Sequence, residues 1–109
     1  MQLTDIPFGI TAWEEIAPTR HSGETGFAVW RTCHFGPLRV RMVEYSANYR
    51  ADHWCEKRHV VLCLAGTLHT ELSDGRTYSL APGMSYQVAD GINAHRSSSI
   101  DGATLFIVD

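Results

Sequence analysis

Short segments of alternating apolar and polar residues cover most of the chain and predict a nearly all-β fold. Leu38–Met42 alternates at every position, as expected of a strand that buries one face. Ser73-Asp74-Gly75-Arg76 predicts a hairpin turn, because Asp-Gly readily takes the positive φ that a tight turn needs. Strands are predicted at residues 27–35, 38–45, 59–64, 67–72, 76–80, 84–88, 94–99 and 103–108. Such closely spaced short strands with glycine-rich turns are typical of a sandwich or barrel.

The first part of the chain has a different pattern. Its one helical candidate is a short turn around Thr11–Ile16, where Thr11 would act as the N-cap, and Pro18 follows soon after. The next residues, up to Glu24, have the composition of a loop. We therefore predict two parts, an N-terminal arm over residues 1–25 and a β-barrel domain over residues 26–109. The length of 109 residues suits one domain of this kind.

Composition narrows the classes of function. Apolar residues make up 44% of the chain and charged residues 19%, which is ordinary for a globular protein. The net charge is -3 and no basic stripe is visible, so nucleic-acid binding is not predicted. The longest apolar run, residues 60–65, is too short to span a bilayer, so no membrane partner is predicted. Three cysteines without an export signal indicate reduced thiols and a cytoplasmic location, with Cys33 and Cys63 as small buried hydrophobic residues.

Four side chains suggest a metal site. His53, Cys55 and His59 lie close together in the sequence, and His95 follows beyond a predicted hairpin. Imidazoles and a thiolate bind zinc, iron, copper or nickel, whereas calcium and magnesium prefer oxygen ligands. If residues 53–55 form a strand, His53 and Cys55 share one face. The thiol of Cys55 must deprotonate to bind, so metal affinity is expected to fall at low pH.

The spacing of these residues resembles the motifs of the cupin superfamily, over roughly residues 36–108. The first cupin motif runs His-x-His, three or four residues, Glu, six residues, Gly. Here His53, Cys55, His59 and Gly66 occupy those positions, so a cysteine and a histidine replace two of the usual ligands. The second motif is matched by Gly75, Pro82, Gly83 and His95. The run Asp52-His53-Trp54-Cys55 further resembles a subgroup of small single-domain cupins.

This resemblance implies a double-stranded β-helix, or jelly-roll, barrel with a divalent transition metal ion held by His53, Cys55, His59 and His95. It also implies a homodimer. The metal could be zinc, iron, copper or nickel. Two alternatives stay open: Cys55 as an inert or redox-active thiol beside three histidines, and a barrel that holds no metal.

Two functions from different classes follow from the resemblance. The first is a metal-dependent enzyme of the dioxygenase, isomerase or lyase type that acts on a small molecule. The second is a non-catalytic metal- or ligand-binding module, such as a sensor, with a closed metal site. No general base stands out, since Glu44, Glu56 and Tyr86 are possible but unsupported candidates. The catalytic residues, the metal and the substrate are therefore not predicted.

Overall fold

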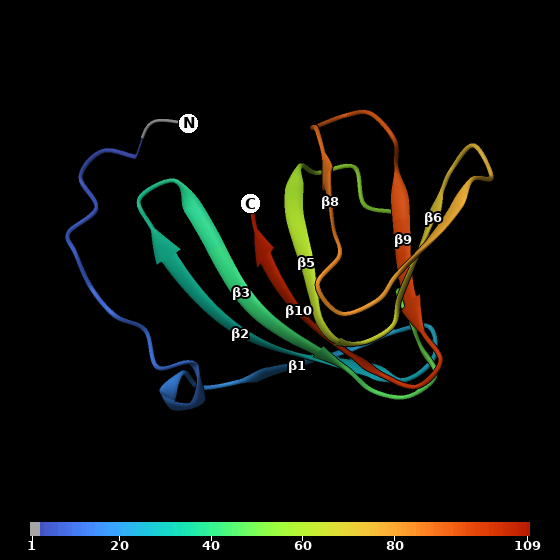
Figure 1. Cartoon of the computed structure of the whole chain (residues 1–109), viewed down its shortest axis with the longest axis horizontal. Coiled ribbons are helices and arrows are strands. Elements are labelled where there is room, and N and C mark those ends of the chain that lie inside the picture. Colours follow the sequence, from blue (N-terminus) through green and yellow to red (C-terminus); the bar gives the residue numbers. More distant parts are fainter. Residues whose placement is uncertain (1–2) are drawn as a thin grey trace.

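A computed structural model describes residues 3–109 and shows two antiparallel sheets that enclose an interior between them (Figure 1). The elements are η1 (Trp13–Glu15), β1 (Thr19–Ser22), β2 (Phe27–Phe35), β3 (Leu38–Tyr45), β4 (Tyr49–Arg50), β5 (His59–Gly66), β6 (Leu68–Leu72), β7 (Thr77–Leu80), β8 (Ser85–Val88), β9 (His95–Ser99) and β10 (Ala103–Val108). The larger sheet has the order β1-β2-β3-β10-β5-β8, and the smaller one the order β4-β9-β6-β7. The predicted all-β fold is therefore confirmed.

Every predicted strand is present, with ends that differ by a residue or two. The hairpin predicted at Asp74-Gly75 joins β6 to β7. Gly75 has a φ of 95°, and the Leu72 amide donates to the carbonyl of Arg76 at 2.8 Å. Positive φ at this turn is what the Asp-Gly pair was expected to supply.

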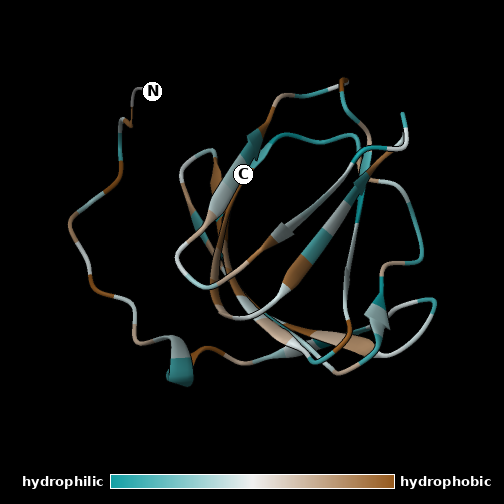
Figure 2. Cartoon of the chain, turned by 45° about the vertical axis from the view of Figure 1, so that its right-hand side comes forward, coloured by the Kyte–Doolittle hydropathy of each residue, from teal (hydrophilic) through white to brown (hydrophobic). Residues whose placement is uncertain are grey.

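The N-terminal segment differs from the predicted arm in one respect. Its residues 19–22 form β1, which pairs with β2 and becomes an edge of the larger sheet. The predicted helical turn is reduced to the 3₁₀ helix η1, and the residue before η1 is Ala12, without a side-chain cap, so the expected capping by Thr11 is wrong. The segment before η1 lies to one side of the barrel (Figures 1 and 2), with Ile6 close to Gly36 in the turn between β2 and β3, and residues 1 and 2 of the predicted arm lie outside the described residues.

The hydrophobic core lies between the sheets and follows the period-two alternation of the strands. Successive inward positions of β10, Ala103, Leu105 and Ile107, are at most 7% exposed. Val43 of β3 and Val61 of β5 flank them across the sheet. Cys63 is fully buried in the same cluster, as expected for a small hydrophobic residue. Figure 2 shows hydrophobic and hydrophilic residues mixed along the strands, with further hydrophobic residues in the segment before η1.

Candidate metal centre

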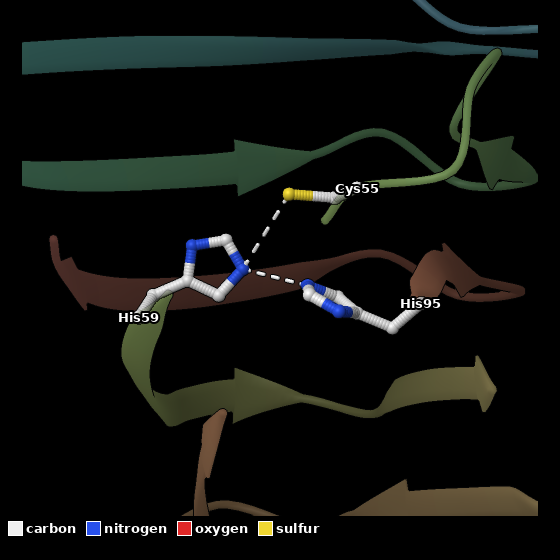
Figure 3. Close-up of side chains that lie close together, drawn as sticks. All are labelled: Cys55, His59 and His95. Carbon is white, nitrogen blue, oxygen red and sulfur yellow. Dashed lines mark hydrogen bonds between the residues drawn. The ribbon is translucent and has the colours of Figure 1, made fainter. Parts of the chain in front are cut away.

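Three of the four predicted ligands meet inside the barrel. Cys55, His59 and His95 place one ligand atom each within 4.8 Å of one another. Figure 3 shows their side chains converging from different segments. His59 is the first residue of β5, and His95 is the first residue of β9. Cys55 lies in the loop between β4 and β5, where its backbone exchanges two hydrogen bonds with His95 at 2.8 and 3.0 Å.

The nitrogen atoms of the two imidazoles are unusually close. His59 Nε2 lies 2.7 Å from His95 Nε2, and Cys55 Sγ lies 3.9 Å from His59 Nε2. The other nitrogen of each ring has an acceptor of its own. His59 Nδ1 lies 3.2 Å from the Asp109 carboxylate, and His95 Nδ1 lies 3.0 Å from the carbonyl oxygen of Asn93.

These outer hydrogen bonds fix the tautomers. A carbonyl or a carboxylate oxygen can only accept, so each Nδ1 must carry the proton and donate it. In neutral rings, both Nε2 atoms then present lone pairs to each other and to the sulfur of Cys55. Two lone pairs at 2.7 Å require a cation between them, either a proton or a metal ion. Histidine ligands of metals are commonly oriented by outer hydrogen bonds of this kind.

Burial and the surrounding charges keep the His59 ring neutral, so that its Nε2 lone pair can bind a cation. Burial lowers the pKa of His59, and the charges of His95 and Arg41 act in the same direction, against the hydrogen bond to Asp109. Burial alone would raise the pKa of Asp109, but the hydrogen bonds from Arg39 and His59 and the charge of Arg41 together hold that pKa well below its usual range. Asp109 is therefore ionised and accepts from His59, while the His59 ring stays neutral.

The donor set fits a transition metal ion. A tetrahedral zinc ion with Zn–N bonds of about 2.05 Å separates two nitrogen ligands by about 3.3 Å, and a nitrogen from a sulfur by about 3.6 Å. His59 and His95 would need to part by about 0.6 Å to reach that nitrogen separation. The 3.9 Å between Cys55 Sγ and His59 Nε2 would need to shorten by about 0.3 Å. Both shifts are small side-chain adjustments, and the ligand atoms of Cys55 and His95, which lie within 4.8 Å of each other, would need to approach as well.

His53, the fourth predicted ligand, lies outside this group. Its side chain is 75% exposed, and its Nδ1 is 2.7 Å from the Asp52 carboxylate. The expectation that His53 and Cys55 share one strand face is wrong, because β4 ends at Arg50 and the segment up to Arg58 is a loop with only an isolated bridge at Cys55. Without a strand, the period-two rule does not apply. His53 still reaches the rim of the adjacent cavity.

A cavity of about 310 Å³ opens beside the three converging side chains. Tyr86 of β8 lines it, with its ring centroid 6.3 Å from that of His59 and 5.9 Å from that of His95. Burial raises the pKa of Tyr86, so its hydroxyl stays protonated and can donate a hydrogen bond. The volume lies at the lower end of the range for small-molecule pockets.

Sequence reasoning missed three residues of the site. Asp109 contacts His59, and it also accepts hydrogen bonds from Arg39 and Arg41 at 2.8 to 2.9 Å. The signal for Asp109 was its spacing, two residues beyond Ile107 on the inward face of β10. The alternation in β3 predicted one buried face without assigning the arginines to it, but Arg41 is only 5% exposed and both Arg39 and Arg41 line the cavity.

Comparisons with known proteins identify the fold. No family model matches the chain, and no curated protein matches it. Among solved structures, an RmlC-like cupin from Shewanella frigidimarina is 15% identical, with a TM-score of 0.74 over 96% of this chain and 92% of that chain. Ectoine synthase from P. lautus is 21% identical, with a TM-score of 0.72 over 93% of this chain and 76% of that chain. The polyketide cyclase RemF from Streptomyces resistomycificus is 20% identical, with a TM-score of 0.75 over 94% and 78%.

These similarities show that the protein has the cupin fold, a jelly-roll barrel of two antiparallel sheets. The resemblance predicted from residues 36–108 is thus confirmed at the level of the fold. Within residues 3–109, no helix is long and apolar enough to cross a membrane.

Proposed function

We propose that this protein is a metal-binding cupin in which Cys55, His59 and His95 hold a divalent transition metal ion, and that it is a metal-dependent enzyme acting on a small molecule. The observation that carries the proposal is the pair of Nε2 atoms 2.7 Å apart, with both outer nitrogens already committed to acceptors. A thiolate and two imidazoles favour zinc, iron, copper or nickel.

The number of ligands favours an enzyme over a closed binding module. A structural zinc site fills four positions with protein ligands, whereas catalytic sites keep one position for water or substrate. The group here offers three ligand atoms, and the cavity of about 310 Å³ lies against all three residues. A bound ion would supply a Lewis acid, or activate water or dioxygen, at a position that a small molecule can reach.

The protein's own groups would orient the ligands and the substrate. Asp109 and the Asn93 carbonyl fix the tautomers of His59 and His95, which keeps both Nε2 atoms available. The protonated hydroxyl of Tyr86 lines the same cavity and would donate to an oxygen of the substrate. Similar structures include proteins named ectoine synthase and polyketide cyclase, and these names support an enzymatic role on small molecules.

Metal reconstitution tests this proposal. The purified protein, without an affinity tag, is loaded separately with zinc, iron, nickel and copper, freed of excess ion, and measured by elemental analysis. We expect close to one ion per chain for at least one metal. His95→Ala and Cys55→Ser should each lower retention at least tenfold, because each removes a ligand atom.

His53→Ala is the matched control, because it removes an imidazole that lies outside the group of three. Retention in this variant should equal that of the wild type. Loss of the ion in His53→Ala would restore the four-ligand site predicted from the sequence. No ion retained by the wild type with any of the four metals would overturn the proposal.

A further inference from the structure

The cavity beside the metal centre carries an excess of positive charge. Among the residues described, its lining includes four cationic side chains and one carboxylate, Glu56. Lys57 and Glu56 carry one charge of each sign, so they add no net charge to the lining. Arg96 lies 3.8 Å from each of Glu24 and Glu71. The cationic lining residues that remain are Arg39 and Arg41.

Arg39 and Arg41 share a single carboxylate. They alternate on the inward face of β3, and both donate to Asp109, Arg39 through Nε and Nη2 and Arg41 through Nη2. The side chains that meet on this wall are two guanidinium groups and one carboxylate, so the cationic side chains outnumber the anionic one. A divalent ion held by the single thiolate of Cys55 would make the site more positive still.

Arg41 also has a buried donor that is not satisfied. Its side chain is 6% exposed and packs over the ring of Trp30 at 4.4 Å, and its Nε has no hydrogen-bond partner among residues 3–109. A buried charged group whose hydrogen-bonding capacity is incomplete is costly, and native proteins seldom keep one without a reason. An anion in the cavity would lower that cost by adding an opposite charge next to the guanidinium.

We infer that the cavity binds a small carboxylate, with the carboxylate group facing Arg41 and Arg39 on β3 and the rest of the molecule directed toward the metal centre. This inference rests on the proposed function and specifies its substrate class. The other walls suit an apolar or aromatic body, since they include Trp30, Tyr45 and Tyr49. Tyr45 and Tyr49 stack on each other with centroids 4.2 Å apart, so this part of the lining is aromatic.

Benzoate and benzamide form a suitable pair of probes, because they have nearly the same shape and differ in charge. Binding of each to the metal-loaded protein is measured by isothermal titration calorimetry. We expect benzoate to bind roughly tenfold to a hundredfold more tightly than benzamide, the range for a hydrogen bond to a charged group. Equal affinities, or no binding of either at millimolar concentration, would overturn the inference.

Replacing Arg41 tests whether its charge is the source of the preference for benzoate over benzamide. Arg41→Met keeps much of the apolar stem over Trp30 and removes the charge, so the preference for benzoate should disappear while circular dichroism shows the fold intact. Arg20→Met is the matched control, because Arg20 of β1 packs over Phe27 of β2 and does not line the cavity. The Arg20→Met protein should prefer benzoate over benzamide to the same extent as the wild type. A preference that survives in Arg41→Met would overturn the inference.

Where Arg41→Met does not fold, Arg39→Met makes the same test at a half-buried position on the same wall. Elemental analysis on the same samples separates the two proposals. A protein that retains the ion but binds benzoate no better than benzamide contradicts only the substrate class. A protein that retains no ion, but whose preference for benzoate is lost in Arg41→Met, contradicts the metal proposal and supports the carboxylate site.

Discussion

Asp109 links the metal centre to the two buried arginines, and replacing it tests that link. In Asp109→Asn the side chain keeps its shape but loses its negative charge and one acceptor oxygen. Asp109 is 8% exposed and accepts from Arg39, Arg41 and His59. The substitution therefore leaves two guanidinium groups without their carboxylate and weakens the bond that fixes the His59 tautomer.

Two magnitudes follow. Loss of an outer partner of a metal-bound histidine typically lowers metal affinity tenfold to a hundredfold, or about 1.4 to 2.8 kcal/mol. Removal of one partner from a buried ion pair costs about 3 kcal/mol of stability, the lower end of the usual range, because Arg39 is 34% exposed. In a domain of this size, a loss of that order lowers Tm by roughly 12 °C.

Both effects can be measured on one preparation. Metal affinity is obtained by competition with a chromophoric chelator, and the Tm of the metal-free protein by circular dichroism. Asp101→Asn is the control, because Asp101 is exposed and should change neither quantity. A folded Asp109→Asn protein whose metal affinity stays within about twofold of the wild type would refute the role of Asp109 in orienting His59.

Three further predictions concern the fold and its assembly. Leu105→Ala removes a 1% exposed side chain from β10 and should lower the free energy of unfolding by about 3 kcal/mol in denaturant titrations. Gly66→Ala should prevent stable folding, because the new Cβ would collide with the Gly102 carbonyl and the backbone there has a φ of 72°. Gly75→Ala has open space around it and a φ of 95°, so it should lower the free energy of unfolding by only about 1 to 2 kcal/mol. Val60 is 50% exposed on the outer face of the larger sheet, where we expect two copies of the chain to pack together. Light scattering should therefore report a dimer for the wild type and a monomer for Val60→Glu. A monomeric wild type would contradict this prediction.

The strands could be predicted from the sequence because their evidence is local. The alternation in β3 and the Asp-Gly turn before β7 depend on nearest neighbours, and these elements lie where they were expected. Alternation did not reveal which face of β3 is inward. Arg39 and Arg41 face the interior because Asp109, seventy positions from Arg39 in the sequence, compensates part of their charge there. That contact is tertiary and leaves no local pattern.

The site was predictable in part for the same reason. The His and Cys spacing identified Cys55, His59 and His95, which the barrel brings together. Grouping His53 with them required a strand at residues 53–55. The chain instead forms a loop there, held by backbone hydrogen bonds between Cys55 and His95. Such a bridge depends on a strand forty residues later, so the local sequence alone could not place the His53 side chain.

Cobalt(II) titration of the metal-free protein tests directly whether Cys55 binds the metal ion, because a cobalt–thiolate bond produces a charge-transfer band in the near ultraviolet. We expect this band to saturate at one equivalent in the wild type and in His53→Ala. We expect it to be absent in Cys55→Ser, even where cobalt still binds. A wild-type protein that binds cobalt without the band, or a band that persists in Cys55→Ser, would contradict metal binding through Cys55.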